Sequence, residues 1–284
     1  MTAWHVRGKT LDVGRPLVMG ILNLTPDSFS DGGRFFSSDA DVFDHVVGML
    51  ESGADIIDVG GESTRPGAVP VSEEDELKRV IPVITRLARE HPAATISIDT
   101  VKSRVARAAL DAGAHVVNDV SGLRLDPGIA TVAASVGAGL ILMHSRGSNV
   151  TELASYQHAS YGDVVVEALG ELRKRIELAR HGGVEGPFIA VDPGIGFSKT
   201  SEQSLAMLAG LPRVAELGFP VVVGVSRKRF IGELTGVREP AGRLGGTLGA
   251  NVAALSLGAR IFRVHDVRPT REALDVAWAI LKRT

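Results

Sequence analysis

Eight short apolar runs recur along the chain and constrain its fold more than any other feature. The runs are rich in β-branched residues, and their apolarity is continuous rather than alternating. They span residues 17–22, 55–59, 95–98, 115–117, 140–143, 188–191, 221–225 and 260–264. Continuous apolarity is typical of strands that are buried on both faces, as in a parallel sheet. The sequence therefore predicts eight parallel strands.

Helical patterns fill the segments between these runs. Ser38 with Asp41, and Ser72 with Asp75, predict helix starts of the capping-box kind. Apolar residues follow each start at helical spacing, and the same spacing recurs around Trp278 near the end of the chain. Each predicted strand is thus followed by a helix.

Eight strand–helix units in 284 residues favour a (β/α)8 TIM barrel. No Pro-rich or Ser-rich linker divides the units, so residues 1–284 are expected to form a single domain. A doubly wound open sheet of this length would usually contain fewer strands. The segment 148–159 is polar and aperiodic, and we expect it to be a loop.

The composition excludes several classes of protein. The chain has no cysteine, which rules out disulfides, thiolate nucleophiles, zinc–thiolate sites and iron–sulfur clusters. Its 31 Lys and Arg residues almost balance 33 Asp and Glu residues, giving a formal net charge of −2. This balance argues against a protein that binds nucleic acid through bulk attraction, so any anion site must be local.

The sequence predicts neither export nor membrane insertion. Its first residues lack the basic, apolar and small-residue order of a signal peptide. The longest uncharged stretch, 127–143, contains several Gly, Ser and Thr residues and is predicted to form a helix, a turn and a strand. We therefore expect a cytoplasmic protein without a membrane partner.

Polar residues follow every predicted strand, which matters because TIM-barrel active sites lie at the carboxyl ends of the strands. These residues include Asn23, Asp58, Glu62, Asp99, Asn118, Asp119, His144, Asp192, Ser226, Lys228, Arg263, His265 and Asp266. Any one of them has an ordinary structural explanation as a helix cap or turn residue. Their coincidence at one barrel mouth predicts an active site.

Arg263 and His265 stand two residues apart on the last predicted strand, so their side chains share a face. An arginine at this position of a barrel favours an anion pocket, with a structural salt bridge as the alternative. The loops 27–33 and 60–67 mix glycine, hydroxyl and charged residues, a composition suited to closing over a ligand.

Two familiar motifs fail on inspection. Residues 194–200, GIGFSKT, resemble a phosphate-binding Walker loop, but Pro193 and Ser198 occupy its two required glycine positions. Residues 224–228 lack the second glycine of a nucleophile elbow. With no dinucleotide-binding fingerprint in place either, serine hydrolases and Rossmann dehydrogenases are excluded.

Seven strings of the chain closely resemble dihydropteroate synthases. They occur in the family's order and span nearly the whole chain: MGILNLTPDSFSDGG (19–33), DVGGESTRPG (58–67), SIDT (97–100), NDVSG (118–122), DPGIGF (192–197), SRK (226–228) and RVHDV (263–267). The resemblance implies a transferase that joins 6-hydroxymethyl-7,8-dihydropterin diphosphate to p-aminobenzoate. The products would be 7,8-dihydropteroate and pyrophosphate.

The resemblance also implies roles for individual residues. The pterin would be held by Asp99, Asn118, Met143, Asp192, Phe197 and Lys228. The diphosphate would be bound by Asn23, Arg263 and His265, and Asn23 would also be the one protein ligand of Mg²⁺. The p-aminobenzoate pocket would be shaped by Phe29, Asp31, Thr64, Arg65, Pro66 and Arg229. The catalytic residues would be Asn23, Asp99, Lys228, Arg263 and His265.

Two positions depart from the family pattern. Arg229 stands where many relatives have the serine that helps bind the p-aminobenzoate carboxylate, and Ser145 stands where methionine is common. The N–H groups at the following helix start could still bind the carboxylate, with Arg229 adding charge. Family members also suggest a homodimer, which apolar residues on the late helices, including Trp278, could support; core packing is the alternative.

Two other functions stay open at this level. A methyltransferase that acts on methyltetrahydrofolate with a corrinoid partner would share the carboxylates that bind the ring. The diphosphate-binding pair and the two signature loops favour the synthase over it. A catalytically silent homologue could bind pterin without turnover, because fold and motif alone do not establish activity.

Overall fold

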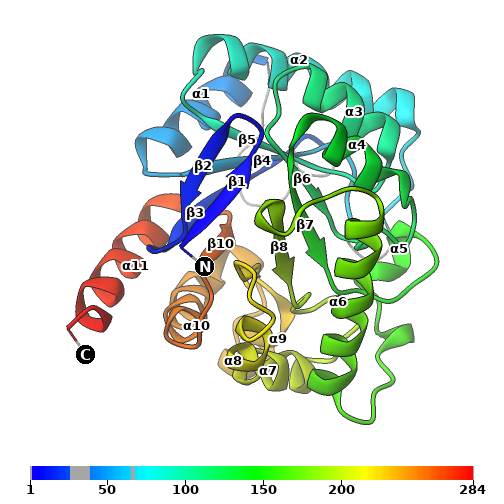
Figure 1. Cartoon of the computed structure of the whole chain (residues 1–284). Coiled ribbons are helices and arrows are strands. Elements are labelled where there is room, and N and C mark those ends of the chain that lie inside the picture. Colours follow the sequence, from blue (N-terminus) through cyan, green and yellow to red (C-terminus); the bar gives the residue numbers. More distant parts are fainter. Residues whose placement is uncertain (1, 26–38, 65–67, 284) are drawn as a thin grey trace.

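Eight parallel strands form the centre of the protein, as the sequence predicts (Figure 1). The computed structural model describes residues 2–25, 39–64 and 68–283. The strands are β3 (Leu17–Asn23), β4 (Ile56–Gly60), β5 (Thr95–Asp99), β6 (Val116–Asp119), β7 (Gly139–Met143), β8 (Ile189–Asp192), β9 (Val222–Val223) and β10 (Ile261–Val264). They pair in the order β8-β7-β6-β5-β4-β3-β10-β9. A parallel bridge between Val191 and Val221 joins the two ends and closes the sheet into a TIM barrel.

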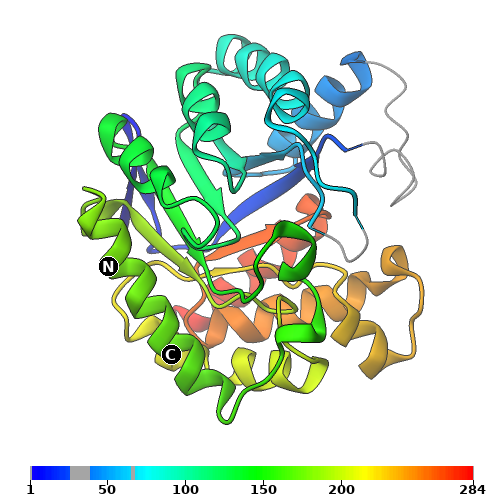
Figure 2. The same ribbon diagram turned by 90° about the vertical axis from the view of Figure 1, so that its right-hand side faces the viewer.

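Helices surround the strands (Figure 2). They are α1 (Asp39–Glu51), α2 (Glu73–Glu90), α3 (Ser103–Asp111), α4 (Gly128–Val136), α5 (Val150–Leu153), α6 (Val164–His181), α7 (Ser201–Ala209), α8 (Leu211–Ala215), α9 (Arg229–Thr235), α10 (Leu244–Ser256) and α11 (Val267–Leu281). Short 3-10 turns add η2 (Tyr156–His158), η3 (Gly186–Phe188) and η4 (Pro240–Arg243). No helix in these described segments is long and apolar enough to cross a membrane.

Local sequence signals explain where several elements begin. The Ser72 hydroxyl accepts a hydrogen bond from the Asp75 N–H at 3.1 Å and caps α2, which confirms that predicted start. Ser38, the other predicted cap, lies outside the described residues. The segment 148–159 contains α5 and η2 and is not a simple loop, because Asn149 and Ser155 cap these short turns with their side chains.

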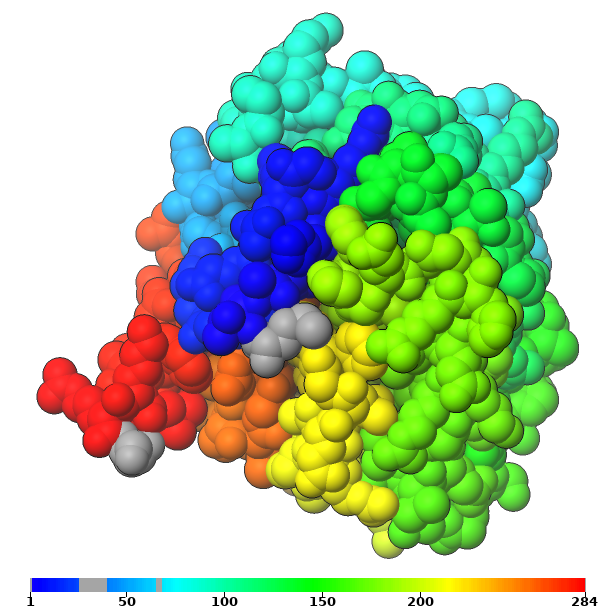
Figure 3. Space-filling view, viewed as in Figure 1, coloured from blue at the N-terminus to red at the C-terminus, as the bar shows by residue number. Residues whose placement is uncertain are grey.

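The interior of the barrel is apolar at its amino end. Side chains that point inward from seven strands pack there with an N-terminal hairpin, β1 (Ala3–Val6) and β2 (Lys9–Asp12). Trp4 is fully buried in this cluster and donates its indole N–H to the Phe188 carbonyl at 3.0 Å. The hairpin lies across this end of the barrel in Figure 1 and forms the dark blue surface at the centre of Figure 3. It therefore closes the bottom of the barrel.

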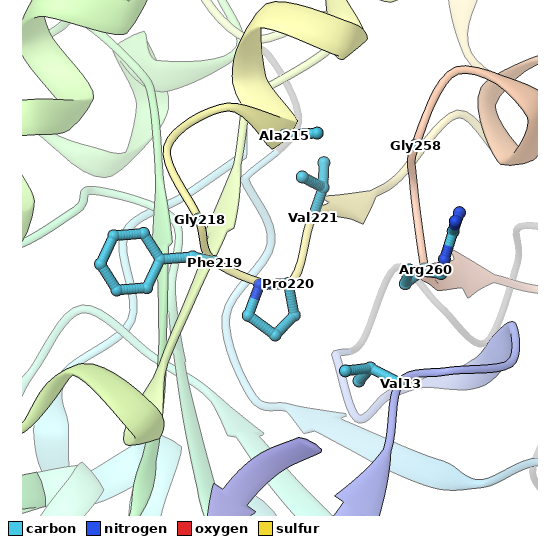
Figure 4. Close-up of a pocket in the computed structure, with 8 residues that line it drawn as sticks. All are labelled: Val13, Ala215, Gly218, Phe219, Pro220, Val221, Gly258 and Arg260. Atoms are coloured by element: carbon cyan, nitrogen blue, oxygen red, sulfur yellow. The ribbon is translucent and has the colours of Figure 1, made fainter. Parts of the chain in front are cut away.

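A glycine allows the hairpin to lie this close. A Cβ atom on Gly139, the first residue of β7, would meet Val6 at 2.7 Å and the Trp4 ring at 3.0 Å. A cavity of about 190 Å³ also lies at this end, beside Val13, Phe219 and Arg260 (Figure 4). It adjoins the amino ends of β9 and β10, so it is separate from the polar strand ends.

Removal of the Trp4 ring should destabilise the fold. Trp4→Ala is expected to lower the free energy of unfolding by about 3–5 kcal/mol, because it leaves a cavity under the barrel and an unpaired Phe188 carbonyl. Urea unfolding measures the effect, with Trp4→Phe as a control that keeps most of the ring volume and should lose less. An unchanged unfolding midpoint in Trp4→Ala would show that the hairpin contributes little.

Candidate active site

The strand register brings polar side chains together at the carboxyl end of the barrel. Asn23 lies opposite Gly60, Gly60 opposite Asp99, and Asp99 opposite Asn118. A Cβ on Gly60 would lie 3.6 Å from the Asn23 Oδ1 and 3.5 Å from the Asp99 Cβ, so this glycine keeps the space between them open. Residues at alternate positions of each strand face inward, and near the mouth they are polar instead of apolar.

These residues line a cavity of about 810 Å³. The cavity is lined by eleven of the residues that the sequence assigns to the site: Asn23, Thr64, Asp99, Asn118, Met143, Asp192, Phe197, Lys228, Arg229, Arg263 and His265. The other four, Phe29, Asp31, Arg65 and Pro66, lie outside the described residues. The structure thus brings every described member of the predicted site to one pocket.

Arg263 of β10 joins the floor of this pocket through two ion pairs. Its Nε donates to Asp58 Oδ2 and its Nη2 to Asp99 Oδ2, each at 2.6 Å. The Asn118 amide also donates to Asp58 Oδ2, at 3.1 Å. Two bonds use only part of the guanidinium, and its remaining N–H groups can donate to an anion. The structure thus confirms the salt-bridge alternative for Arg263, and the anion pocket stays a prediction that these remaining N–H groups allow.

Burial makes the Asp99 carboxylate unusually basic. Removal from water raises the pKa of Asp99 to about 7, although the Arg263 charge opposes the rise and the neighbouring carboxylate of Asp58 adds to it. Asp99 can therefore gain or lose a proton near neutral pH. Groups with such pKa values are characteristic of functional sites.

Lys228 and Asp192 face the pocket from the other side. Burial lowers the pKa of Lys228 to about 7, while Asp192 favours its charged form. The Lys228 Nζ lies 4.2 Å from the centre of the Phe197 ring and donates to the Ile195 carbonyl. Burial also raises the pKa of Asp192, whose Oδ1 accepts the Gly194 N–H at 2.7 Å. An ammonium, a carboxylate and an aromatic face thus lie side by side.

The SRK string has a local structure that explains its pattern. Arg227 adopts a left-handed backbone (φ 60°), which a non-glycine residue rarely does without support. Its guanidinium donates through Nε and Nη2 to both carboxylate oxygens of Asp266, at 3.0 and 2.8 Å. This pair ties the loop after β9 to the end of β10 and fixes the turn from which Lys228 extends.

Ser226 positions the histidine of the site. Its hydroxyl lies 2.9 Å from His265 Nδ1 and accepts the His265 N–H at 3.2 Å. Because these bonds hold both the backbone and the ring, His265 faces the same cavity as Arg263. This confirms that the two residues share one face of the barrel.

Asp58 is a buried residue of the site for which the sequence predicts no role. The sequence places it among the polar strand ends, and the structure shows that it is fully buried and contacts both Arg263 and Asn118. One sequence signal points to a role for Asp58, because an aspartate inside an otherwise apolar run is costly to bury without a charged partner. The partner could not be identified, since Arg263 is more than two hundred residues away in the sequence.

Arg229 contacts Tyr156, a partner that the sequence does not predict. Its guanidinium stacks 3.8 Å from the centre of the Tyr156 ring, and its Nε donates to the Tyr156 hydroxyl at 2.9 Å. Glu233 lies one helical turn further on, at 3.4 Å. Arg229 and Tyr156 thus form one wall at the outer part of the cavity.

The described residues do not themselves build a complete metal cage. Among them there is no cluster of three His, Cys, Asp or Glu side chains suited to a metal ion. Asn23 offers one neutral oxygen to the cavity. This donor fits a Mg²⁺ ion that takes most of its ligands from phosphate oxygens and water.

Comparisons with known proteins agree with this geometry. Residues 19–265 match the model of the pterin binding enzyme family. A dihydropteroate synthase from Synechocystis is 47% identical over 275 residues, which cover 96% of this chain and 93% of the relative.

Solved structures give the same result. A Xanthomonas albilineans dihydropteroate synthase determined with 4-aminobenzoic acid has a TM-score of 0.89 and 44% identity, covering 99% of this chain and 98% of that one. Another structure from the same organism, in complex with 7,8-dihydropteroate, has a TM-score of 0.85 and 39% identity over 99% of both chains. The chain therefore belongs to the dihydropteroate synthases, within the family of pterin binding enzymes.

Proposed function

We propose that this cavity joins 6-hydroxymethyl-7,8-dihydropterin diphosphate to p-aminobenzoate, giving 7,8-dihydropteroate and pyrophosphate. The observation that carries the proposal is one pocket that combines Asn118, Asp192 and Lys228 with the guanidinium of Arg263 and the imidazole of His265. The first group suits a flat heterocycle and the second suits an anion. Relatives bind 4-aminobenzoic acid and 7,8-dihydropteroate, which supports the choice of substrates.

The pterin would bind through its polar edge. A pterin ring presents several N–H donors beside a carbonyl acceptor, and carboxylates with an amide can pair with such a row. In the proposal, Asp99, Asn118 and Asp192 accept from the ring, and the Lys228 ammonium donates to the carbonyl or a ring nitrogen. Met143 and Phe197 pack against its faces.

The diphosphate would lie beside Arg263, His265 and Asn23. Bound Mg²⁺, with Asn23 as its protein ligand, would neutralise part of the diphosphate charge. The N–H groups of Arg263 that do not bond to Asp58 or Asp99 would bind phosphate oxygens, and so would His265, whose ring contacts the Ser226 hydroxyl. These groups are placed before the reaction begins, so they need little reorganisation.

The reaction follows from where charge develops. The bond between the pterin methylene carbon and the diphosphate oxygen breaks, and its electron pair leaves with the diphosphate. The lone pair of the p-aminobenzoate nitrogen then forms the new C–N bond to the cationic methylene, and the nitrogen releases a proton. A covalent nucleophile is not needed, and each preorganised donor to the leaving group is worth about 3 kcal/mol.

The p-aminobenzoate would enter from the outer part of the cavity. Thr64 and Arg229 line this part, and Arg229 could attract the carboxylate. Phe29, Asp31, Arg65 and Pro66 belong to the same proposed pocket by resemblance alone. Their loops would exclude water from the cationic intermediate.

This reading is preferred to the two alternatives. The relatives that match nearly the whole chain are dihydropteroate synthases, which does not support the corrinoid-linked methyltransferase. A silent homologue is separated from an active enzyme by direct assay. With both substrates and Mg²⁺, pyrophosphate and dihydropteroate should appear in equal amounts, and a chelator should abolish both. Pterin binding without either product would favour the silent homologue.

The proposal includes a homodimer that works in the cytoplasm. Val276 and Ile280 lie one turn apart on α11 and are 64% and 61% exposed. Trp278, in contrast, packs partly against the core, so it is Val276 and Ile280 that would meet a second copy. Light scattering should give twice 29.9 kDa, and Ile280→Asp should shift the mass toward the monomer. A wild-type mass of one chain would contradict the dimer.

Loss of the Arg263 guanidinium should strongly reduce turnover. Arg263→Ala is expected to lower kcat/KM by about 100-fold to 1000-fold, because one preorganised donor to the leaving group is removed. Arg263→Lys should recover only part of the activity, since a single ammonium cannot bridge Asp58 and Asp99 while binding phosphate. Steady-state kinetics measure both. The exposed Arg268 on α11 provides a matched control, Arg268→Ala, and equal effects at 263 and 268 would refute the assignment.

A further inference from the structure

The lysine of the failed Walker motif has a position that the proposed reaction does not explain. Lys199 is fully buried, which is rare for a lysine without close partners. It lies in the loop 193–200 between β8 and α7, directly after Phe197 and Ser198. The loop follows Asp192 and contains Phe197, and both of these residues line the proposed pterin pocket.

Three acceptors surround the Lys199 ammonium. Its Nζ lies 2.8 Å from His144 Nδ1 and donates to the carbonyls of Gly194 and Phe197, each at 3.1 Å. Three N–H donors therefore meet three acceptors, which satisfies an ammonium completely. Because two of the acceptors belong to the loop itself, the loop is folded around its own cation.

The backbone is shaped for this arrangement. Gly194 has a left-handed φ of 69°, and a Cβ there would lie 1.8 Å from the His144 carbonyl oxygen. Ser198 also has a positive φ of 47°, and its hydroxyl, with one proton to donate, lies 2.5 Å from the Arg146 carbonyl and 3.0 Å from the Leu153 carbonyl. Such backbone conformations persist only where surrounding contacts hold them. The loop is thus held both from inside and from outside.

A second row of contacts supports the lysine. His144 is buried, and its Nε2 lies 3.0 Å from Glu171 Oε2, while Glu171 Oε1 accepts from Arg146 Nε at 3.0 Å. Since His144 Nδ1 accepts from Lys199, the network assigns the ring proton to Nε2, which donates to Glu171. Burial lowers the pKa of His144 to about 4, which keeps the ring neutral and able to accept.

The charges around Lys199 are nearly balanced. Asp192 and Glu171 favour its charged form, whereas Lys228 and Arg146 oppose it. Burial is the largest effect and lowers the pKa of Lys199 to about 7. Keeping an ammonium in this place is therefore costly unless its three acceptors stay together.

The loop that Lys199 holds presents groups to the pterin pocket. The Gly194 N–H donates to Asp192 Oδ1, and the Ile195 carbonyl accepts from Lys228. The Phe197 ring lies against the Lys228 ammonium. The loop that accepts from Lys199 thus also orients the Asp192 carboxylate through the Gly194 N–H and the Lys228 ammonium through the Ile195 carbonyl. It carries the Phe197 ring as well.

We propose that Lys199 is a positioning residue for pterin binding. Its buried ammonium, seated on His144, holds the β8–α7 loop in the form that presents Asp192, Phe197 and Lys228 to the heterocycle. The inference rests on the proposed function for the identity of the ligand. It assigns the lysine of the GIGFSKT string an inward role instead of the phosphate contact that a Walker lysine makes.

The first test is Lys199→Met, which removes the ammonium and keeps most of the side-chain volume. The apparent KM for the pterin diphosphate should rise about tenfold or more, because Asp192 and Phe197 lose their alignment. The KM for p-aminobenzoate at saturating pterin diphosphate should change by less than about twofold. Lys174→Met on the exposed face of α6 is the matched control and should leave both constants unchanged.

A purely structural lysine would give a different result. It would lower the melting temperature without separating the two KM values. If folded Lys199→Met keeps the wild-type pterin KM, or if both KM values rise equally, the proposal is wrong.

A second pair of variants covers the case in which Lys199→Met does not fold. His144→Phe removes the acceptor for Lys199 and should raise the pterin KM in the same direction, whereas His144→Gln restores an oxygen acceptor and should recover most of the loss. Equal constants in these two variants would overturn the proposal. Calorimetric titration with the pterin diphosphate measures its dissociation constant in the same variants without turnover. A wild-type protein that binds the pterin but gives no product would contradict the proposed function, and the binding comparison would still test the role of Lys199.

Discussion

The contact between Arg263 and two buried carboxylates is the interaction on which the site depends. Asp58 and Asp99 lie on neighbouring strands, and without a cation their charges would repel one another in a poorly hydrated place. Arg263 reaches both from β10, on the far side of β3. The last strand, β10, must therefore pair with β3 before these charges are compensated, so folding and the assembly of this charged cluster are linked.

The barrel interior is divided along its axis into two different environments. At the amino end, Trp4 and inward-facing aliphatic side chains fill the space and exclude water. At the carboxyl end, the same inward positions carry Asp58, Asp99, Asn118, Asp192 and Arg263. Because the packed apolar half fixes the positions of the strands, the polar groups at their carboxyl ends are also held in place for binding a ligand.

Much of this could be predicted from the sequence, because buried parallel strands have continuous apolar runs and polar residues at their ends mark the mouth. The run 17–22 predicts the strand β3 (Leu17–Asn23) to within one residue, and the run 95–98 predicts β5 (Thr95–Asp99) equally well. The N-terminal hairpin was missed, since it is short and owes its place to Trp4 packing beneath the barrel. The roles of Asp58 and Lys199 depend on partners distant in sequence, which local patterns do not identify.

The barrel wall has its fewest backbone hydrogen bonds where β8 meets β9. Every other pair of neighbouring strands shares a ladder, but β8 and β9 are joined in the described structure by the single bridge between Val191 and Val221. Asp192 stands on one side of this seam and Lys228 on the other. Two groups that are proposed to bind the same polar edge of the pterin therefore stand on either side of this seam. Because β8 and β9 share no ladder, the bond from Lys228 to the Ile195 carbonyl is a contact that joins the two sides of the seam at the mouth of the barrel.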